Sequence, residues 1–386
     1  MRRKNMFLLM LLLTIHQPQL TVMLIVMVGS SLLFLLWYYS FRFEVINFRL
    51  VTKNINVTPV KSNKNYRMNN NYNCNGGVYP FLKILHLSDF HLRKDRKGKK
   101  LFSFLKSLSQ QEVDLIFITG DLVERNENIE YLTRMLSVLR AKYGKYAVLG
   151  VHDYYNKTPA EFIRNMFKKK RRYKRENNVD HLISELNNTG IKVLRNESVS
   201  VLINSKTEKK PNKIKRIKII GLDDPIIEKI DIKKAFGEDG ESTKSTKNTC
   251  KERDFMKSRQ LRKALLKETF NLNKTKIHRL NSSEELRIAL IHTPDQDSLA
   301  EIAKRGVDIV FSGHTHGGQV RLPLIGALVS GCKIKTKFAE GLFYFKRFVL
   351  HVSKGLGEGR YSQFRFFCQP EASIININLP RRKETL

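Results

Sequence analysis

Residues 308–319 read DIVFSGHTHGGQ, and this stretch decides how the chain is interpreted. It opens with four residues of strand character, Asp308–Phe311, and continues into a loop of glycines and histidines that holds His314 and His316. In an extended segment, residues i and i+2 point to the same side, so both imidazoles can reach one site. A short buried strand that ends in such a loop indicates a sheet with a functional site at the ends of its strands.

The same pattern, a short apolar run followed by a polar loop, recurs along the chain. The predicted strands are Lys83–Leu87, Asp114–Thr119, Tyr146–Leu149, Ile217–Ile220, Arg287–Ile291 and Asp308–Phe311. Stretches with helical periodicity, such as Lys100–Leu108 and Glu130–Arg140, lie between several of them. This alternation predicts an α/β fold with a largely buried sheet. In such folds, ligands bind at the carboxyl ends of the strands, where these polar loops lie.

The polar loops supply two carboxylates and five imidazoles. These candidate ligands are Asp89, His91, Asp121, His152, His292, His314 and His316. Imidazole and carboxylate together are the ligands of borderline divalent ions such as Mn, Fe and Zn. A carboxylate can bridge two ions, and a pair of ions can clamp the attacking and leaving oxygens of a displacement reaction. The alternative is that these are unrelated core and surface residues, and the repeated position after a strand argues against it.

Five motifs in order along the chain resemble those of the calcineurin-like metallophosphoesterases. They are Asp89–His91 (D-x-H), Gly120-Asp121, Gly150–His152, His292, and GHTHGGQ at 313–319. The sequence in and around these motifs, with SDFH, HTPD, GLGEGR and FRFFCQPE, is most similar to that of a membrane-associated bacterial branch of the family. That branch includes exported phosphoesterases and, more distantly, UDP-2,3-diacylglucosamine pyrophosphatases.

The resemblance implies a four-layer sandwich of two mixed β-sheets flanked by helices. It also implies that Asp89, His91 and His316 hold a first metal, that Asp121 bridges, and that His292 and His314 hold a second one. In the family, a metal-bound hydroxide attacks phosphorus. His152, which is not a ligand there, would be the catalytic residue that steadies the developing charge or protonates the leaving oxygen, a task that suits imidazole near neutral pH.

The chain departs from the family pattern at one ligand. The family's G-N-H-D motif reads Gly150-Val151-His152-Asp153 here, so Val151 stands where a metal-binding Asn is expected. Because an isopropyl group has no lone pair, we expect weaker occupancy of the second metal site. Reduced or absent activity is therefore an alternative to full catalysis.

Composition limits the class of protein. The chain has 386 residues, with 41% hydrophobic and 27% charged, which excludes a disordered or collagen-like chain. The four cysteines are scattered without a C-x-x-C pair, which argues against a disulfide scaffold or a zinc finger. The net charge of +34 implies anionic partners such as a membrane surface or nucleic acid. Compositional bias toward Lys, Asn and Ile would produce the same excess.

An apolar segment near the N-terminus predicts a membrane anchor. Leu20–Tyr39 contains no charged residue and ends in Trp37-Tyr38-Tyr39, a belt typical of the membrane interface. A shorter run, Met6–Ile15, either extends this helix or lies in the interface. Basic residues on both flanks leave the orientation open, with the extracytoplasmic side favoured for the catalytic domain. A cleaved export signal is the alternative, but no clear cleavage site follows.

The predicted organisation is therefore an anchor at 1–44, a polar linker at 45–80 and a metallophosphoesterase domain at 81–380. Basic or low-complexity insertions are expected near 165–178 and 237–285, the first of them around the stretch Lys168–Arg175.

The expected function is a membrane-anchored, dimetal-dependent phosphoester hydrolase whose substrate is a phospholipid or a lipid-linked nucleotide. The expected partners are membrane lipids and a phosphate-containing small molecule or lipid, and the oligomeric state is left open. A nucleotide phosphodiesterase or nuclease is one alternative, although no motif indicates nucleic acid as a specific partner. The other is a catalytically weak or inactive, membrane-tethered binding protein, because of Val151.

Overall fold

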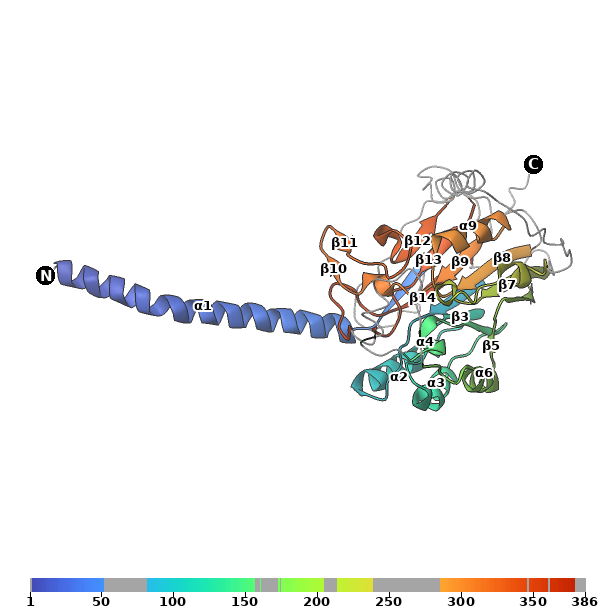
Figure 1. Cartoon of the computed structure of the whole chain (residues 1–386), viewed down its shortest axis with the longest axis horizontal. Helices are drawn as coiled ribbons and strands as arrows, with labels where there is room; N and C mark the ends of the chain where they lie inside the picture. Colours follow the sequence, from blue (N-terminus) through green and yellow to red (C-terminus); the bar gives the residue numbers. More distant parts are fainter. Residues whose placement is uncertain are drawn as a thin grey trace.

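A computed structural model describes residues 2–51, 82–156, 160, 173, 175–204, 214–238, 285–345, 347–359 and 362–378. Within them, two six-stranded sheets and a small hairpin form the body, and a long N-terminal helix projects from it (Figure 1). Both sheets mix parallel and antiparallel pairs. The expected mixed α/β architecture is therefore confirmed.

The first sheet has the strand order β1-β14-β2-β3-β4-β5. Its strands are β1 (Glu44–Val51), β14 (Glu371–Asn378), β2 (Leu82–Leu87), β3 (Leu115–Thr119), β4 (Lys145–Val148) and β5 (Ile191–Val193). Strands β2 to β5 are parallel, β14 runs antiparallel to β2, and β1 pairs in parallel with β14. The strand that follows the N-terminal helix is thus held at the sheet edge by the last strand described in the chain.

The second sheet has the order β12-β13-β9-β8-β7-β6. Its strands are β12 (Gly341–Tyr344), β13 (Val349–Val352), β9 (Ile309–Ser312), β8 (Glu285–Ile291), β7 (Ile214–Leu222) and β6 (Glu197–Asn204). The four central strands are parallel, and an antiparallel strand closes each edge. The hairpin of β10 (Arg321–Leu322) and β11 (Gly326–Ala327) follows the GHTHGGQ motif directly in the sequence.

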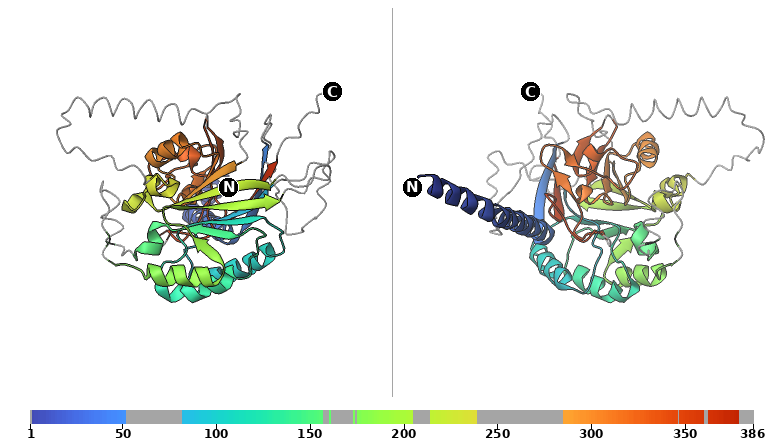
Figure 2. Two further views of the ribbon diagram at one scale, coloured as in Figure 1. Left: turned by 90° about the vertical axis from the view of Figure 1, so that its right-hand side faces the viewer. Right: turned by 60° about the vertical axis from the view of Figure 1, so that its left-hand side comes forward.

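Three apolar clusters define four layers. Between the sheets, Phe117 and Val148 of the first sheet pack with Ile288 and Phe311 of the second. On the outer face of the first sheet, three helices cover one cluster: α2 (Arg96–Leu108), α3 (Ile129–Leu136) and α6 (Val179–Asn188). On the outer face of the second sheet lie α7 (Ile232–Phe236) and α9 (Gln296–Lys304). Figure 2 shows the two helical layers on opposite sides of the sheets. This is the expected four-layer sandwich.

All six predicted strands are present, with ends that differ by a few residues from those expected. The two predicted helices correspond to α2 and α3, and α3 ends at Leu136, earlier than expected. The predicted linker is wrong at its start, because residues 44–51 form strand β1. In EVINFRLV, alternate side chains pack on opposite faces, with Val45 against the helical layer and Phe48 between the sheets. The rest of that linker and most of both predicted insertions lie outside the described residues.

The N-terminal helix α1 (Arg2–Phe41) is continuous through both apolar runs of the sequence. Within it, Thr21–Phe41 is long and apolar enough to cross a membrane, with a mean hydropathy of 2.1 over its most apolar window. A signal sequence would have the same properties. The end of α1 is fixed to the body, because Ser40 accepts a hydrogen bond from the Arg365 backbone at 2.8 Å and the Phe43 ring stacks on Phe104.

A buried ion cluster strengthens this attachment. The ammonium group of Lys354 forms ion pairs with Glu44 at the start of β1 and with Glu371 at the start of β14, the latter at 3.1 Å, and lies 3.9 Å from Glu340. Burial disfavours the charged lysine, but these three carboxylates outweigh burial and raise the pKa of Lys354. The cluster therefore joins the first residue of β1 to the opposite end of the sequence.

Replacing Lys354 should destabilise the body. In Lys354→Met, the buried carboxylate of Glu371 loses its counter-charge, as do the half-buried ones of Glu44 and Glu340. We therefore expect the free energy of unfolding to fall by about 3–5 kcal/mol. Denaturant titration of the full chain in detergent micelles measures this change. Lys192→Met, which replaces an exposed lysine on β5, is the control and should change stability by less than about 0.5 kcal/mol. Equal stability of the two variants would show that the cluster contributes nothing.

Candidate metal centre

The candidate ligands lie in loops at the carboxyl ends of strands from both sheets. Asp89 and His91 follow β2, Asp121 follows β3, His292 follows β8, and His314 and His316 follow β9. All of these except His292 have a positive φ, between 40° and 69°. Such backbone conformations cost of order 1–3 kcal/mol each in non-glycine residues and cluster at functional sites. The strain marks this edge of the sandwich as a site.

Two glycines allow the loops to approach closely. A Cβ atom on Gly313 would lie 1.8 Å from Ser88 Oγ and 2.3 Å from Asp89 Oδ2. A Cβ atom on Gly150 would lie 2.2 Å from Asp121 Oδ1. Side chains at these positions would therefore displace the two carboxylates, which explains why both motifs require glycine.

Asp89, His91 and His316 form one group of potential ligands. One donor atom from each lies within 4.8 Å of the others, with His91 Nε2 at 3.1 Å from His316 Nε2 and Asp89 Oδ1 at 3.5 Å from His316 Nε2. The Asp89 carboxylate also accepts hydrogen bonds from the Ser88 hydroxyl and the His314 backbone. Its orientation is thus fixed by neighbours from both sheets.

Asp121, His292 and His314 form a second group within the same limit of 4.8 Å. Asp121 Oδ2 lies 3.2 Å from His292 Nε2 and 3.5 Å from His91 Nε2, so this one carboxylate faces both groups. The backbone N–H of His152 donates to Asp121 Oδ1 at 2.9 Å, and the other ring nitrogen of His292 lies 2.6 Å from the Thr119 carbonyl.

The mutual interaction of Asp121 and His292 favours the charged form of both side chains. Burial opposes ionisation of Asp121, but the neighbouring His292 and His152 outweigh burial and hold its pKa well below the usual range. Burial likewise opposes protonation of His292, but Asp121 outweighs it and raises the pKa of that imidazole well above normal. The site thus holds an ionised carboxylate in the protein interior, beside groups that compensate its charge.

His152 lies beside both groups. It belongs to the short helix α4 (Val151–Tyr154), and one of its ring nitrogens is within 4.8 Å of donor atoms of His91 and Asp121. The structure therefore brings all seven predicted residues together. Val151, which precedes His152, is buried, with 1% of its surface exposed.

Glu124 is a site residue that the sequence analysis missed. Its buried carboxylate accepts from His91 Nδ1 at 2.6 Å and lies 3.4 Å from His152 Nδ1. Because Nδ1 of His91 is bound to Glu124, its other ring nitrogen, Nε2, faces Asp121 and His316. A metal-binding histidine usually donates its second ring N–H to a carboxylate in this way. The sequence feature that could have identified Glu124 is its position in GDLVE, three residues after Asp121.

Two further buried residues position the loops. Asp153 accepts hydrogen bonds from the backbone of Leu122 at 2.7 Å and Gly150 at 2.9 Å, and so fixes the Gly150 loop against the Asp121 loop. Arg365 donates to the carbonyl groups of residues 354, 355 and 357, and its guanidinium lies 3.5 Å from His316 Nδ1. Their role comes from backbone contacts, which a sequence pattern does not display.

The residues fit a pair of divalent cations. Two groups of carboxylate and imidazole donors meet around Asp121, and within each group the donor atoms lie no more than 4.8 Å apart. Oxygen and nitrogen donors of this kind suit Mn, Fe or Zn. A four-layer α/β sandwich with such a site between its sheets defines a metal-dependent hydrolase of phosphate esters. The family model for calcineurin-like phosphoesterases matches residues 82–318, more than half of the chain, and the chain belongs to that family.

Curated relatives agree with this assignment. The chain is 27% identical to the uncharacterized metallophosphoesterase YkoQ of Bacillus subtilis, over 77% of this chain and 83% of that protein. It is 26% identical to the UDP-2,3-diacylglucosamine pyrophosphatase LpxG of Chlamydia muridarum, over 76% and 83% of the two chains. Among solved structures, the calcineurin-like phosphoesterase YfkN of Bacillus subtilis aligns at 13% identity over 76% of this chain and 90% of that one, with a TM-score of 0.36.

Glu124→Gln should weaken metal binding. The glutamine keeps the size of the side chain but removes the charge that supports His91, so we expect metal affinity to fall by roughly 10–100-fold. Calorimetric titration of the metal-stripped full chain with Mn²⁺ measures the affinity. Glu127→Gln, an exposed position three residues further along, should bind Mn²⁺ as the unmodified chain does. Unchanged affinity in Glu124→Gln would show that Glu124 has no role in holding the ligand.

Proposed function

We propose that this chain is a membrane-anchored, dimetal-dependent hydrolase that cleaves a phosphoester or pyrophosphate bond of a lipid-linked substrate. The observation that supports it most strongly is the position of Asp121, whose carboxylate faces both groups of potential metal ligands. A single acceptor shared by two donor groups is what a pair of bridged cations requires.

Asp89, His91 and His316 would hold one cation, and His292 and His314 the other, with Asp121 shared between them. When bound, two such cations supply Lewis-acid activation of water and compensate the charge of the phosphoryl oxygens. His152 is the proposed catalytic residue. Its imidazole lies at the edge of both groups, with 14% of its side chain exposed, where it can donate a proton to the leaving oxygen.

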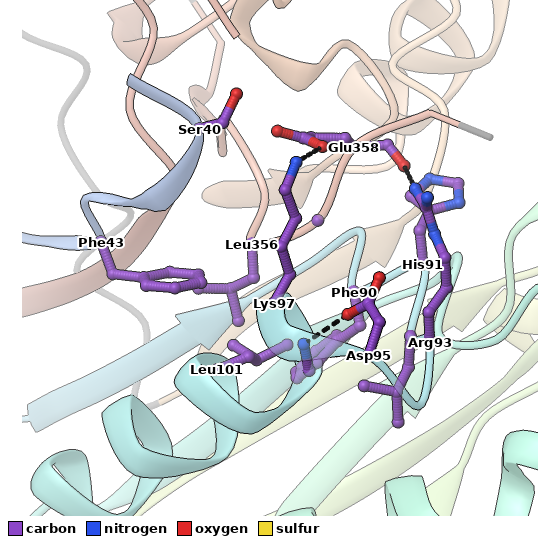
Figure 3. A pocket seen from close by; sticks show the side chains of 13 residues that line it. Ser40, Phe43, Phe90, His91, Arg93, Asp95, Lys97, Leu101, Leu356 and Glu358 are labelled. Atoms are coloured by element: carbon purple, nitrogen blue, oxygen red, sulfur yellow. Dashed lines mark hydrogen bonds and ion pairs between the residues drawn. The ribbon is translucent and has the colours of Figure 1, made fainter. Parts of the chain in front are cut away.

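The proposed lipid-linked substrate rests on the position of the anchor relative to the site. A pocket begins at Ser40, in the last turn of the apolar helix, and at Phe43, and extends along Lys97 and Glu358 to the ring of His91 (Figure 3). The charged side chains that line this pocket are Arg93 and Lys97 together with Asp95 and Glu358, and Lys97 is paired with Glu358. A polar headgroup that leaves the bilayer beside α1 would therefore meet a polar path that ends at the metal centre. The name of the LpxG relative, a pyrophosphatase for an acylated sugar nucleotide, agrees with such a substrate.

A comparison of two substrates tests this proposal. With Mn²⁺ in mixed micelles, the full chain should hydrolyse UDP-2,3-diacylglucosamine faster than UDP-N-acetylglucosamine, because only the first carries acyl chains. His152→Ala should lower the turnover by about 10²–10⁴-fold while metal content is kept, since it removes a proton donor and no proposed ligand. His181→Ala, at an exposed position on α6, is the matched control.

Equal turnover of both nucleotides would favour a nucleotide phosphodiesterase instead. No turnover of any phosphoester, with folded protein and bound metal, would favour the alternative of a membrane-tethered binding protein.

Val151 gives a separate prediction about the second cation. Because valine offers no donor atom, we expect the purified chain to retain clearly less than two ions per molecule at micromolar Mn²⁺. Val151→Asn should bring the metal content close to two and raise turnover. Elemental analysis of the purified proteins measures the metal content, and Val151→Leu, which has the branching of asparagine but no donor atom, controls for substitution at this buried position. A folded Val151→Asn protein with unchanged metal content would show that the side chain at 151 does not reach the cation.

A further inference from the structure

The β10–β11 hairpin exposes an unusual amount of apolar surface. Residues 322–329 read LPLIGALV and contain no polar side chain. Leu324 is fully exposed, Ile325 is 71% exposed, and Val329 is 65% exposed. We refer to the exposed side chains of Leu322, Leu324, Ile325, Leu328 and Val329 as the apolar tip. Contiguous exposed apolar side chains of this kind indicate contact with an apolar partner or medium.

The backbone of the hairpin is shaped to project these side chains. Leu324 has a φ of 69°, in the left-handed region where a turn after proline usually has glycine. A branched, apolar side chain in this conformation is strained and, in water, gains nothing from its full exposure. The choice of leucine at this turn is explained if its side chain enters a non-aqueous medium.

Contacts connect the apolar tip to the end of α1. The Tyr39 ring, at the end of the apolar helix, packs on Phe366 and Phe367 with centroid distances of 6.3 and 4.9 Å. The Phe366 carbonyl accepts from the backbone of Arg321, the first residue of β10, at 2.9 Å. In Figure 1 the hairpin lies on the side of the body from which α1 projects. If Thr21–Phe41 crosses a bilayer, the hairpin therefore faces the surface of the same bilayer.

Charge around this region fits anionic headgroups. Lys97 and Lys100 lie over the ring of Phe41, the last residue of α1, and Arg42 lies over Tyr38. A few residues after the apolar tip in the sequence, Lys333 and Lys335 are exposed. Apolar side chains between basic residues are typical of segments that enter the membrane interface.

We propose that the β10–β11 hairpin inserts its apolar tip into the bilayer as a second membrane contact, in addition to α1. This proposal rests on the proposed anchor, because the direction of α1 sets the plane of the membrane. The hairpin is fixed to the metal centre, since Arg321 donates to the Gly317 carbonyl at 2.9 Å and Gly331 contacts the ring of His314. Insertion would therefore hold the GHTHGGQ loop at the membrane surface, within reach of a substrate whose acyl chains stay in the bilayer.

Tryptophan quenching by brominated lipids tests the proposal. Trp37 is the single tryptophan of the chain. In nanodiscs of phosphatidylcholine and phosphatidylglycerol with brominated chains, the emission of unmodified protein reports whether α1 is inserted. In Trp37→Phe/Ile325→Trp, the only tryptophan lies on the apolar tip. In Trp37→Phe/Leu202→Trp it lies on β6, at another exposed apolar position, 57% exposed against 71% for Ile325.

We expect brominated lipid to reduce the emission of Trp37 and of Trp at position 325 roughly two-fold or more, since an inserted tip reaches about 5–10 Å into the boundary between headgroups and acyl chains. The control with Trp at position 202 should be unchanged. Adding Leu324→Asp to the Ile325→Trp reporter should bring its quenching close to that of the control.

Each of the other possible quenching results would overturn either the hairpin proposal alone or the hairpin proposal together with the anchor. Quenching of Trp37 but not of the Ile325→Trp reporter would overturn the hairpin proposal and leave the anchor in place. A blue-shifted but unquenched reporter at position 325 would show that a second copy of the chain covers the tip. No quenching of Trp37 would overturn the anchor and the hairpin proposal together. None of these readings depends on hydrolytic activity, so failure of the proposed reaction would be seen separately.

Discussion

The arrangement of the site depends on one buried carboxylate between two sheets. Asp121 comes from the first sheet, yet its closest imidazole partner, His292 at 3.2 Å, comes from the second. An ionised carboxylate in the interior is costly unless charged or hydrogen-bonding partners surround it. Here the partners are His292, His91 and the backbone of His152, and each must come from a different loop. The strained, left-handed residues at the strand ends follow from the need to bring these loops together.

Hydrogen bonds and ion pairs connect the metal-binding site to the end of the apolar helix. Arg365 joins three regions, because its backbone donates to Ser40 while its guanidinium donates to the carbonyl groups of residues 354, 355 and 357 and lies beside His316. The start of β1 is fixed by Lys354 in the same segment. The exit of α1, the first sheet and one of the ligand loops therefore form a connected structure, and the proposed anchor would determine the orientation of the metal centre relative to a membrane.

Much of this could be predicted from the sequence, because the central strands and their polar loops carry local signals. The apolar runs that became β2, β3, β4, β7, β8 and β9 are largely buried, and an aspartate or a histidine follows each of them in a polar loop. Strand β1 was missed because its residues directly follow the apolar helix and include Asn47 and Arg49, and it becomes a strand only by pairing with β14. Its partner lies more than 300 residues away, so no local pattern reveals the pair.

The candidate site, too, could be predicted only where its residues belong to short local motifs. Ligands that belong to short motifs, such as Asp89 with His91, were found from their spacing. Glu124 and Arg365 were not, because their function lies in what they position: Glu124 orients His91, and Arg365 orders several backbone carbonyl groups. Such roles depend on contacts across the fold, and the residue types by themselves are common on protein surfaces.

The pairing of β1 with β14 has a consequence for biosynthesis. A ribosome produces the apolar helix and β1 more than 300 residues before β14, so the edge of the first sheet stays incomplete throughout that interval of translation. During that interval, β1 is an unpaired strand attached to the segment that a translocon would receive. Premature termination before residue 371 would leave β1 and β2 without the strand between them, and such a product exposes two strand edges that favour aggregation.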